Sequence, residues 1–168
     1  MSTRETVTMP ETEYTIEPGK YELTTSTVID APRDLVFRAY TDPKLFARWW
    51  GPSQYENEII KFESRSGGEW HVVQKAKDGT THGFRGVNHD VVAPERICQT
   101  FEYLGVPGHV ALQTATFEAL GNKTRIVAQM VFQSVMDRDM MVASGMKSGA
   151  DESMERLQRL LEELKTSK

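Results

Sequence analysis

Few residues in this chain form a pattern that is typical of an enzyme active site. The sequence contains no GxSxG, HExxH, Walker or GxGxxG motif. The stretch Gly145-Met146-Lys147-Ser148-Gly149 resembles a nucleophile elbow, but its serine has the wrong spacing for one. A more ordinary interpretation is that Gly145 and Gly149, four residues apart on one helix face, allow close backbone approach to a sheet or a ligand.

The titratable side chains that could act in catalysis or hold a metal are scattered along the chain. The histidines show no HxH or HxxxH spacing, so we expect no metal site. They are His71, His82, His89 and His109. Cys98, the single cysteine, is expected to be a buried or half-buried small side chain. Glu63, Glu69 and Glu118 could reach a cavity only if a strand register shifts by one residue, so we predict no catalytic residue and no cofactor.

The aromatic and methionine side chains are more informative. The chain has three Trp, five Tyr, seven Phe and eight Met. Under the strand assignments below, many of them project to one sheet face or lie on the last helix. We predict a cavity lined by Trp50, Trp70, Phe84, Gln99, Phe101, Tyr103, Met130, Phe132, Met146 and Ala150. Gln99 and Tyr103 would orient a ligand there. Simple core packing against the last helix is the alternative for each residue.

Length and composition bound the class of protein. A chain of 168 residues is one domain with one sizeable core. A net charge of −4 gives no electrostatic reason to bind nucleic acid, and one cysteine excludes an internal disulfide framework. No apolar run approaches the roughly 18 residues that span a bilayer, and the N-terminus lacks the apolar region of a secretory signal. We therefore expect a cytoplasmic monomer or homodimer.

The order of predicted elements divides the chain into an arm and a domain. Residues 1–20 are expected to form a flexible N-terminal arm with a short extended piece near 14–16, and residues 21–168 a single domain. After the first strand, Asp30-Ala31-Pro32 and Asp42-Pro43 predict the starts of two short helices.

Alternating segments then predict a series of antiparallel strands. With the first strand, they cover residues 21–29, 55–64, 69–76, 82–92, 96–104, 110–120 and 124–135. The last predicted element is a long amphipathic helix, which begins near Ser134 and continues to the C-terminus.

Segregated strands and helices favour an α+β fold with an antiparallel sheet of about seven strands. One helix is only about 10–12 Å across, so it covers such a sheet only if the sheet curls around it. A curled sheet on one helix leaves space between the two, which is a natural place for a ligand.

The element order and several local segments resemble the START-like (SRPBCC) superfamily and its helix-grip fold. More closely, they resemble the activator of heat-shock protein 90 ATPase-like family. The matching segments are 29–52, 66–73, 93–97 and 144–157, and the first contains the specific pattern APxxxVFxAxTDPxxxxxWWGP. The resemblance covers about residues 21–164. The family often has Trp after the second glycine of GMxxG, where this chain has Ala150, which widens the cavity or moves its aromatic wall.

Three functions stay open at this point. The first expectation is a module that binds a small, mostly hydrophobic molecule between the sheet and the C-terminal helix. The resemblance implies the second, a stress-response protein that interacts with a chaperone. The third is an enzyme, since relatives in the superfamily include cyclases and hydrolases that use acids and bases in the cavity.

Overall fold

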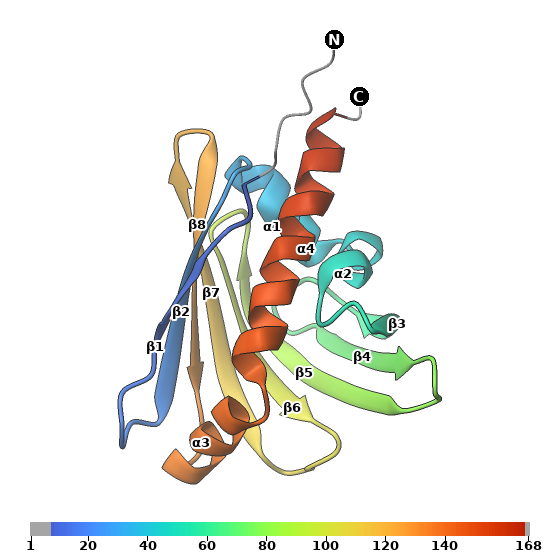
Figure 1. Ribbon diagram of the computed structural model, residues 1–168, viewed down its shortest axis with the longest axis vertical. Helices are drawn as coiled ribbons and strands as arrows, with labels where there is room; N and C mark the ends of the chain where they lie inside the picture. Colours follow the sequence, from blue (N-terminus) through green and yellow to red (C-terminus); the bar gives the residue numbers. More distant parts are fainter. Residues whose placement is uncertain (1–7, 167–168) are drawn as a thin grey trace.

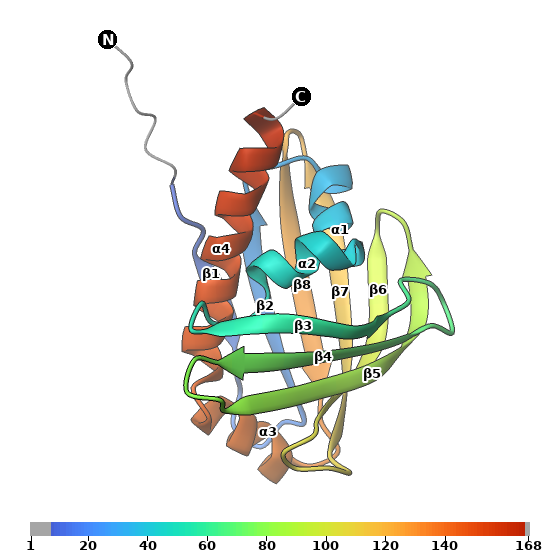
Figure 2. The same ribbon diagram turned by 90° about the vertical axis from the view of Figure 1, so that its right-hand side faces the viewer.

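One antiparallel sheet dominates the structure, a computed structural model that describes residues 8–166. Within those residues eight strands lie in the order β1-β2-β8-β7-β6-β5-β4-β3. Their bounds are β1 Thr12–Thr15, β2 Glu22–Ile29, β3 Tyr55–Phe62, β4 Glu69–Ala76, β5 Thr81–Val92, β6 Arg96–Tyr103, β7 Val110–Leu120 and β8 Lys123–Val131. Figure 2 shows β3, β4 and β5 crossing steeply over the direction of β7 and β8, so the sheet is strongly curled.

Four helices complete the described fold. The two short ones, α1 (Arg33–Thr41) and α2 (Pro43–Trp49), connect β2 to β3. The chain ends with α3 (Val135–Ala143) and the long α4 (Met146–Thr166), which runs along the concave side of the sheet. Figure 1 shows α4 in front of the sheet, with α1 and α2 beside its C-terminal half. This is the α+β helix-grip arrangement that the sequence predicted.

The helix starts follow from local chemistry. Asp42 caps α2 by accepting a 2.9 Å hydrogen bond from the Lys44 backbone N–H, and Pro43 follows where a missing N–H costs nothing. Ser134 caps α3 by accepting a 3.0 Å hydrogen bond from the Asp137 N–H. Both caps lie where the sequence predicted them.

The main core fills the space between the concave face, α1, α2 and α4. Its fully buried members include Ile29 at the end of β2, Val36 on α1, Phe117 on β7, and Leu157 and Leu161 on α4. A second, smaller cluster lies at the other end of the sheet, next to α3. It consists of Leu23, Ala111, Met130 and Phe132.

Polar side chains of α4 fix the helix against the segments that flank α1 and α2. The Gln158 amide accepts a 2.8 Å hydrogen bond from the Asp30 N–H and donates one of 3.2 Å to the Asp30 carbonyl. The Arg156 guanidinium donates to the carbonyl oxygens of Arg48 and Gly51 at 2.9 and 2.5 Å. These contacts hold the end of α2, and therefore the residues that follow it, in a defined place over the sheet.

Two sequence predictions are wrong in detail. The short extended piece expected near residues 14–16 of the N-terminal arm is a full strand, β1 at Thr12–Thr15, which pairs with β2 at the edge of the sheet and adds an eighth strand to the seven expected. Residues 1–7 of that arm lie outside the described residues. The single final helix is instead two helices, because the chain turns at Gly145 with a positive φ of 89°. Gly145 is therefore a turn residue, whereas Gly149 lies in α4 near the ring of Pro52.

Candidate functional site

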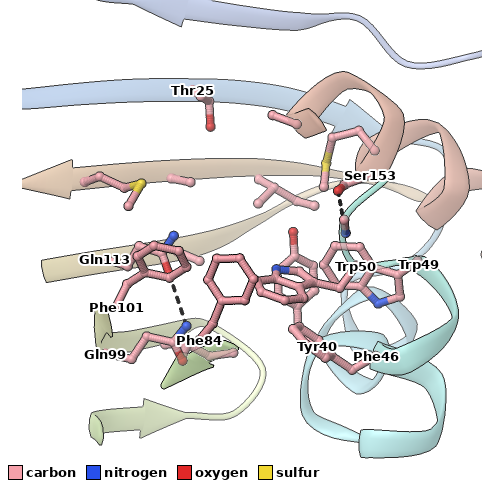
Figure 3. Close-up of a pocket in the computed structure, with 18 of the residues that line it drawn as sticks. Thr25, Tyr40, Phe46, Trp49, Trp50, Phe84, Gln99, Phe101, Gln113 and Ser153 are labelled. Atoms are coloured by element: carbon pink, nitrogen blue, oxygen red, sulfur yellow. Dashed lines mark hydrogen bonds between the residues drawn. The ribbon is translucent and has the colours of Figure 1, made fainter. Parts of the chain in front are cut away.

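A cavity of about 360 Å³ lies between the concave face of the sheet, the end of α2 and the first turns of α4. Its size is at the lower end of the range usual for small-molecule sites. Twelve aromatic and methionine side chains line it: Tyr40, Phe46, Trp49, Trp50, Phe62, Trp70, Phe84, Phe101, Met130, Met141, Met146 and Met154. Figure 3 shows Phe84, Phe101 and Trp50 along one side, with Thr25 facing them from β2.

The aromatic wall is a continuous set of ring contacts. Trp50 stacks on Phe46 with centroids 5.3 Å apart, and meets Phe84 edge-on at 5.1 Å. Phe84 contacts Phe101 at 5.5 Å, and Phe101 contacts Trp70 at 6.0 Å. Contacts of this kind join the end of α2 to three strands of the sheet. The wall is therefore rigid and apolar, and suited to the flat face of an organic molecule.

The loop after α2 places Trp50 over the cavity. The Trp49 indole N–H donates a 2.9 Å hydrogen bond to the Ala39 carbonyl, which fixes α2 on α1. Ser153 on α4 accepts a 2.9 Å hydrogen bond from the Gly51 N–H, visible as a dashed line in Figure 3. Trp50, between these anchors, is half-buried and lines the cavity.

A pair of glutamines stands on the sheet side of the cavity. The Gln99 amide donates a 3.2 Å hydrogen bond to the Gln113 side-chain carbonyl across β6 and β7. This bond leaves the Gln113 N–H groups available, and Figure 3 shows that amide nitrogen pointing away from Gln99. The predicted polar group at Gln99 therefore has a protein partner, and the available donors belong to its neighbour.

Besides the Thr25 hydroxyl, two further polar side chains reach the cavity without a hydrogen-bond partner among the described residues. One is the phenol of Tyr40, whose pKa burial raises well above its usual range. The other is the amide of Gln74, a residue only 5% exposed, on the same face of β4 as Trp70. A Cβ at Gly51 would lie 2.1 Å from the Gln74 amide nitrogen, so the glycine makes room for that amide.

The described residues that line the cavity carry no charged side chain. Within residues 8–166 the lining includes no Asp, Glu, Lys, Arg, His or Cys, and Tyr40 is its one titratable side chain. Glu63, Glu69 and Glu118 are not part of the lining, and they form ion pairs with Lys61 and Arg125 outside it. The described lining thus lacks the pair of titratable groups with opposed pKa values that acid–base catalysis would use.

The structure brings eight of the ten predicted site residues to the cavity. They are Trp50, Trp70, Phe84, Gln99, Phe101, Met130, Met146 and Ala150. Tyr103 and Phe132 do not line it, contrary to the prediction. The Tyr103 hydroxyl instead hydrogen bonds the Nδ1 atom of His82 at 2.7 Å, and Phe132 is buried with Leu23 and Ala111 beneath α3.

Tyr40, Gln74 and Gln113 are among the polar lining residues that the sequence reasoning missed. Tyr40 follows Val36 and Ala39 on α1 at the spacing of an apolar stripe, which fits its ring but says nothing about its hydroxyl. Its ring packs on Trp49 and Phe117 with centroids 4.6 and 4.9 Å apart. Gln74 could have been found, because strand alternation from the predicted inward residue Trp70 places it on the same face.

The other titratable groups do not form a second site of recognisable chemistry. His82 lies between two tyrosines, with Tyr55 3.3 Å from Nε2 and Tyr103 on Nδ1. His109 pairs with Asp137 at 3.0 Å on the surface. Cys98 is half-buried, and its Sγ accepts a hydrogen bond from Thr114. No cluster of three metal-ligating side chains occurs in the part of the chain that the structure describes.

No helix of the described residues is long and apolar enough to cross a membrane.

Comparison with known protein families matches most of the chain to one family. Residues 30–162 match the model of a family described as Activator of Hsp90 ATPase homolog 1-like protein. A search of curated proteins found no relative of the chain.

Solved structures share the architecture at low sequence identity. A solution NMR structure of a protein from Arthrobacter aurescens is 24% identical, with a TM-score of 0.82 over 90% of this chain and 91% of its own. A crystal structure of a protein from Rhodobacter sphaeroides is 23% identical, with a TM-score of 0.81 over 90% of this chain and 99% of its own. CalU16 from Micromonospora echinospora is 18% identical, with a TM-score of 0.62 over 94% and 90%. At these identities the likeness concerns the fold.

Proposed function

Because the chain belongs to the family of Activator of Hsp90 ATPase homolog 1-like proteins, whose fold encloses a cavity, we propose that it binds a small, mostly hydrophobic molecule there. The bound molecule lies between the concave face of the sheet and α4. Its apolar surface supplies most of the affinity, at roughly 25 cal/mol per Å² removed from water. The polar side chains of the lining set its orientation.

The composition of the cavity wall carries this proposal. Twelve aromatic or methionine side chains line about 360 Å³ of space, and no charged side chain of the described residues joins them. Simple core packing would leave no such volume, because protein interiors are packed as densely as organic crystals. The space equals the liquid volume of about 12 water molecules, enough for a molecule of one to three fused rings.

Binding of a neutral fluorescent probe tests the proposal directly. N-phenyl-1-naphthylamine should bind with increased emission, and Ala150→Trp should weaken binding at least about tenfold because the indole fills the cavity. Ala143→Trp is the matched control, since Ala143 is exposed at the end of α3. Native mass spectrometry of the purified protein should in addition show a bound small molecule. Equal probe binding by both variants, or no binding by the unchanged protein, would contradict the proposal.

A further inference from the structure

The cavity holds polar groups that its packing does not explain. A phenylalanine at position 40 would make the same ring contacts with Trp49 and Phe117 as the tyrosine does. The hydroxyl therefore has no role in these contacts. A tyrosine hydroxyl inside a protein usually has a hydrogen-bond partner, and this one, on a half-buried side chain that lines the cavity, has none among the described residues. The open space beside it is the cavity, so a molecule bound there is in a position to supply the partner.

The Gln74 amide, at the end of the cavity near Gly51, also lacks a hydrogen-bond partner among the described residues. Its side chain is buried, and its amide makes no hydrogen bond within residues 8–166. The amide also depends on a glycine, because a side chain on Gly51 would overlap its nitrogen. The amide therefore faces the cavity, where a bound molecule could pair with it.

The absence of charge restricts what that partner is. Burying an ionised group without a counter-charge costs far more than burying a neutral polar group. The described lining offers no charged side chain to an ammonium, carboxylate or phosphate group. It does offer the hydroxyls of Tyr40 and Thr25, the Gln74 amide and the available N–H groups of Gln113. These groups suit a neutral oxygen, such as a carbonyl or an ether.

We propose that the ligand is uncharged where it is buried and carries a hydrogen-bond acceptor that pairs with the Tyr40 hydroxyl, which makes Tyr40 the residue that selects and orients it. This inference rests on the proposed function of the cavity. It names a ligand class, neutral ring compounds with a carbonyl or similar oxygen. Figure 3 shows Tyr40 beside Phe46 and Trp50, so an acceptor bound to it would place the rest of the molecule against the aromatic wall.

Four compounds built on the fluorene skeleton test separately whether the ligand needs a hydrogen-bond acceptor and whether it must be uncharged. Fluorene has no acceptor, 9-fluorenone adds one neutral carbonyl, and fluorene-9-carboxylate adds a charge at neutral pH. The methyl ester of that acid is a neutral control of similar size. Each compound is measured by displacement of N-phenyl-1-naphthylamine. We expect 9-fluorenone to bind about three- to tenfold more tightly than fluorene, the usual gain for one net hydrogen bond. The carboxylate should bind at least about tenfold more weakly than its methyl ester.

The variant Tyr40→Phe identifies the residue responsible. It should remove the preference for 9-fluorenone over fluorene and leave the affinity for fluorene within about twofold. Tyr103→Phe is the control, because its hydroxyl binds His82 outside the cavity, and it should keep the preference. The inference is overturned if Tyr40→Phe keeps the preference, or if the carboxylate and the ester bind equally. If neither the probe nor any fluorene binds, the proposed function fails and the inference fails with it.

Discussion

Replacing Trp70 with alanine tests whether the cavity wall is also part of the stabilising core. Trp70 is 4% exposed and belongs to the main core cluster. Its indole N–H donates a 3.2 Å hydrogen bond to the Thr100 carbonyl, and its ring lies 6.0 Å from Phe101. Gly86 lets the indole lie against β5, because a Cβ there would come within 2.5 Å of the indole nitrogen.

The size of the effect follows from these contacts. Truncating a buried Trp to Ala costs about 3–5 kcal/mol. The cavity already removes packing from one side of the Trp70 ring, so we expect about 3 kcal/mol, the lower end of that range. Trp70→Phe keeps most of the apolar surface and loses the hydrogen bond, which predicts about 1–2 kcal/mol. A protein of typical stability would remain folded with either change.

Urea unfolding followed by far-ultraviolet circular dichroism measures the loss. The midpoint should fall while the slope m stays the same, because the surface exposed on unfolding hardly changes. His71→Ala is the control on the same strand, since His71 is half-buried and faces the opposite side, and it should cost below about 0.5 kcal/mol. A loss below about 1 kcal/mol for Trp70→Ala would show that Trp70 lines the cavity without supporting the core, and would refute this reasoning.

Two further predictions concern the polar groups of the cavity. Gly51→Ala should cost about 1–2 kcal/mol in urea unfolding, since Gly51 has a φ of +79° and the new Cβ would meet the Gln74 amide. If Gln74→Ala does not recover part of that loss in the double variant, the contact is not its cause. Burial raises the pKa of Tyr40, so above about pH 10 the unfolded chain loses a proton that the folded protein keeps. Unfolding free energy should then fall with rising pH by up to about 1.4 kcal/mol per unit. An equally steep fall in Tyr40→Phe would contradict this assignment.

The fold was predictable because its signals are local. Alternation placed β4 at Glu69–Ala76 and β7 at Val110–Leu120 with the bounds that the structure has. The Asp-Pro pair before α2 marked a helix start that depends only on neighbouring residues. The edge strand β1 carries only a weak signal, enough to predict a short extended piece near residues 14–16 but not a strand of the sheet. Its four residues TEYT show no apolar alternation, and its place depends on pairing with β2 and on a 2.6 Å hydrogen bond from Tyr14 to Asp151.

The sequence predicted which face of the sheet carries the site, but not how far along the strands the cavity extends. Alternation correctly assigned Tyr103 and Phe132 to the concave side, where Phe101 and Met130 also lie. The period of two along a strand says nothing about how far along that strand the cavity extends. Tyr103 lies past one end of the cavity, where β5 supplies His82, and Phe132 lies past the other, beneath α3. Only the three-dimensional position of the helices decides where a concave face is filled and where it is open.

The turn at Gly145 explains why methionines from two helices share the cavity. Met141 belongs to α3 and Met146 to α4, and both line it. On one continuous helix, side chains five residues apart point about 140° away from each other, so they could not both face the same cavity. The left-handed conformation of Gly145 changes the chain direction between them, which a residue with a side chain rarely allows. The sequence prediction of a single final helix placed both methionines on one element, yet their shared position depends on the break.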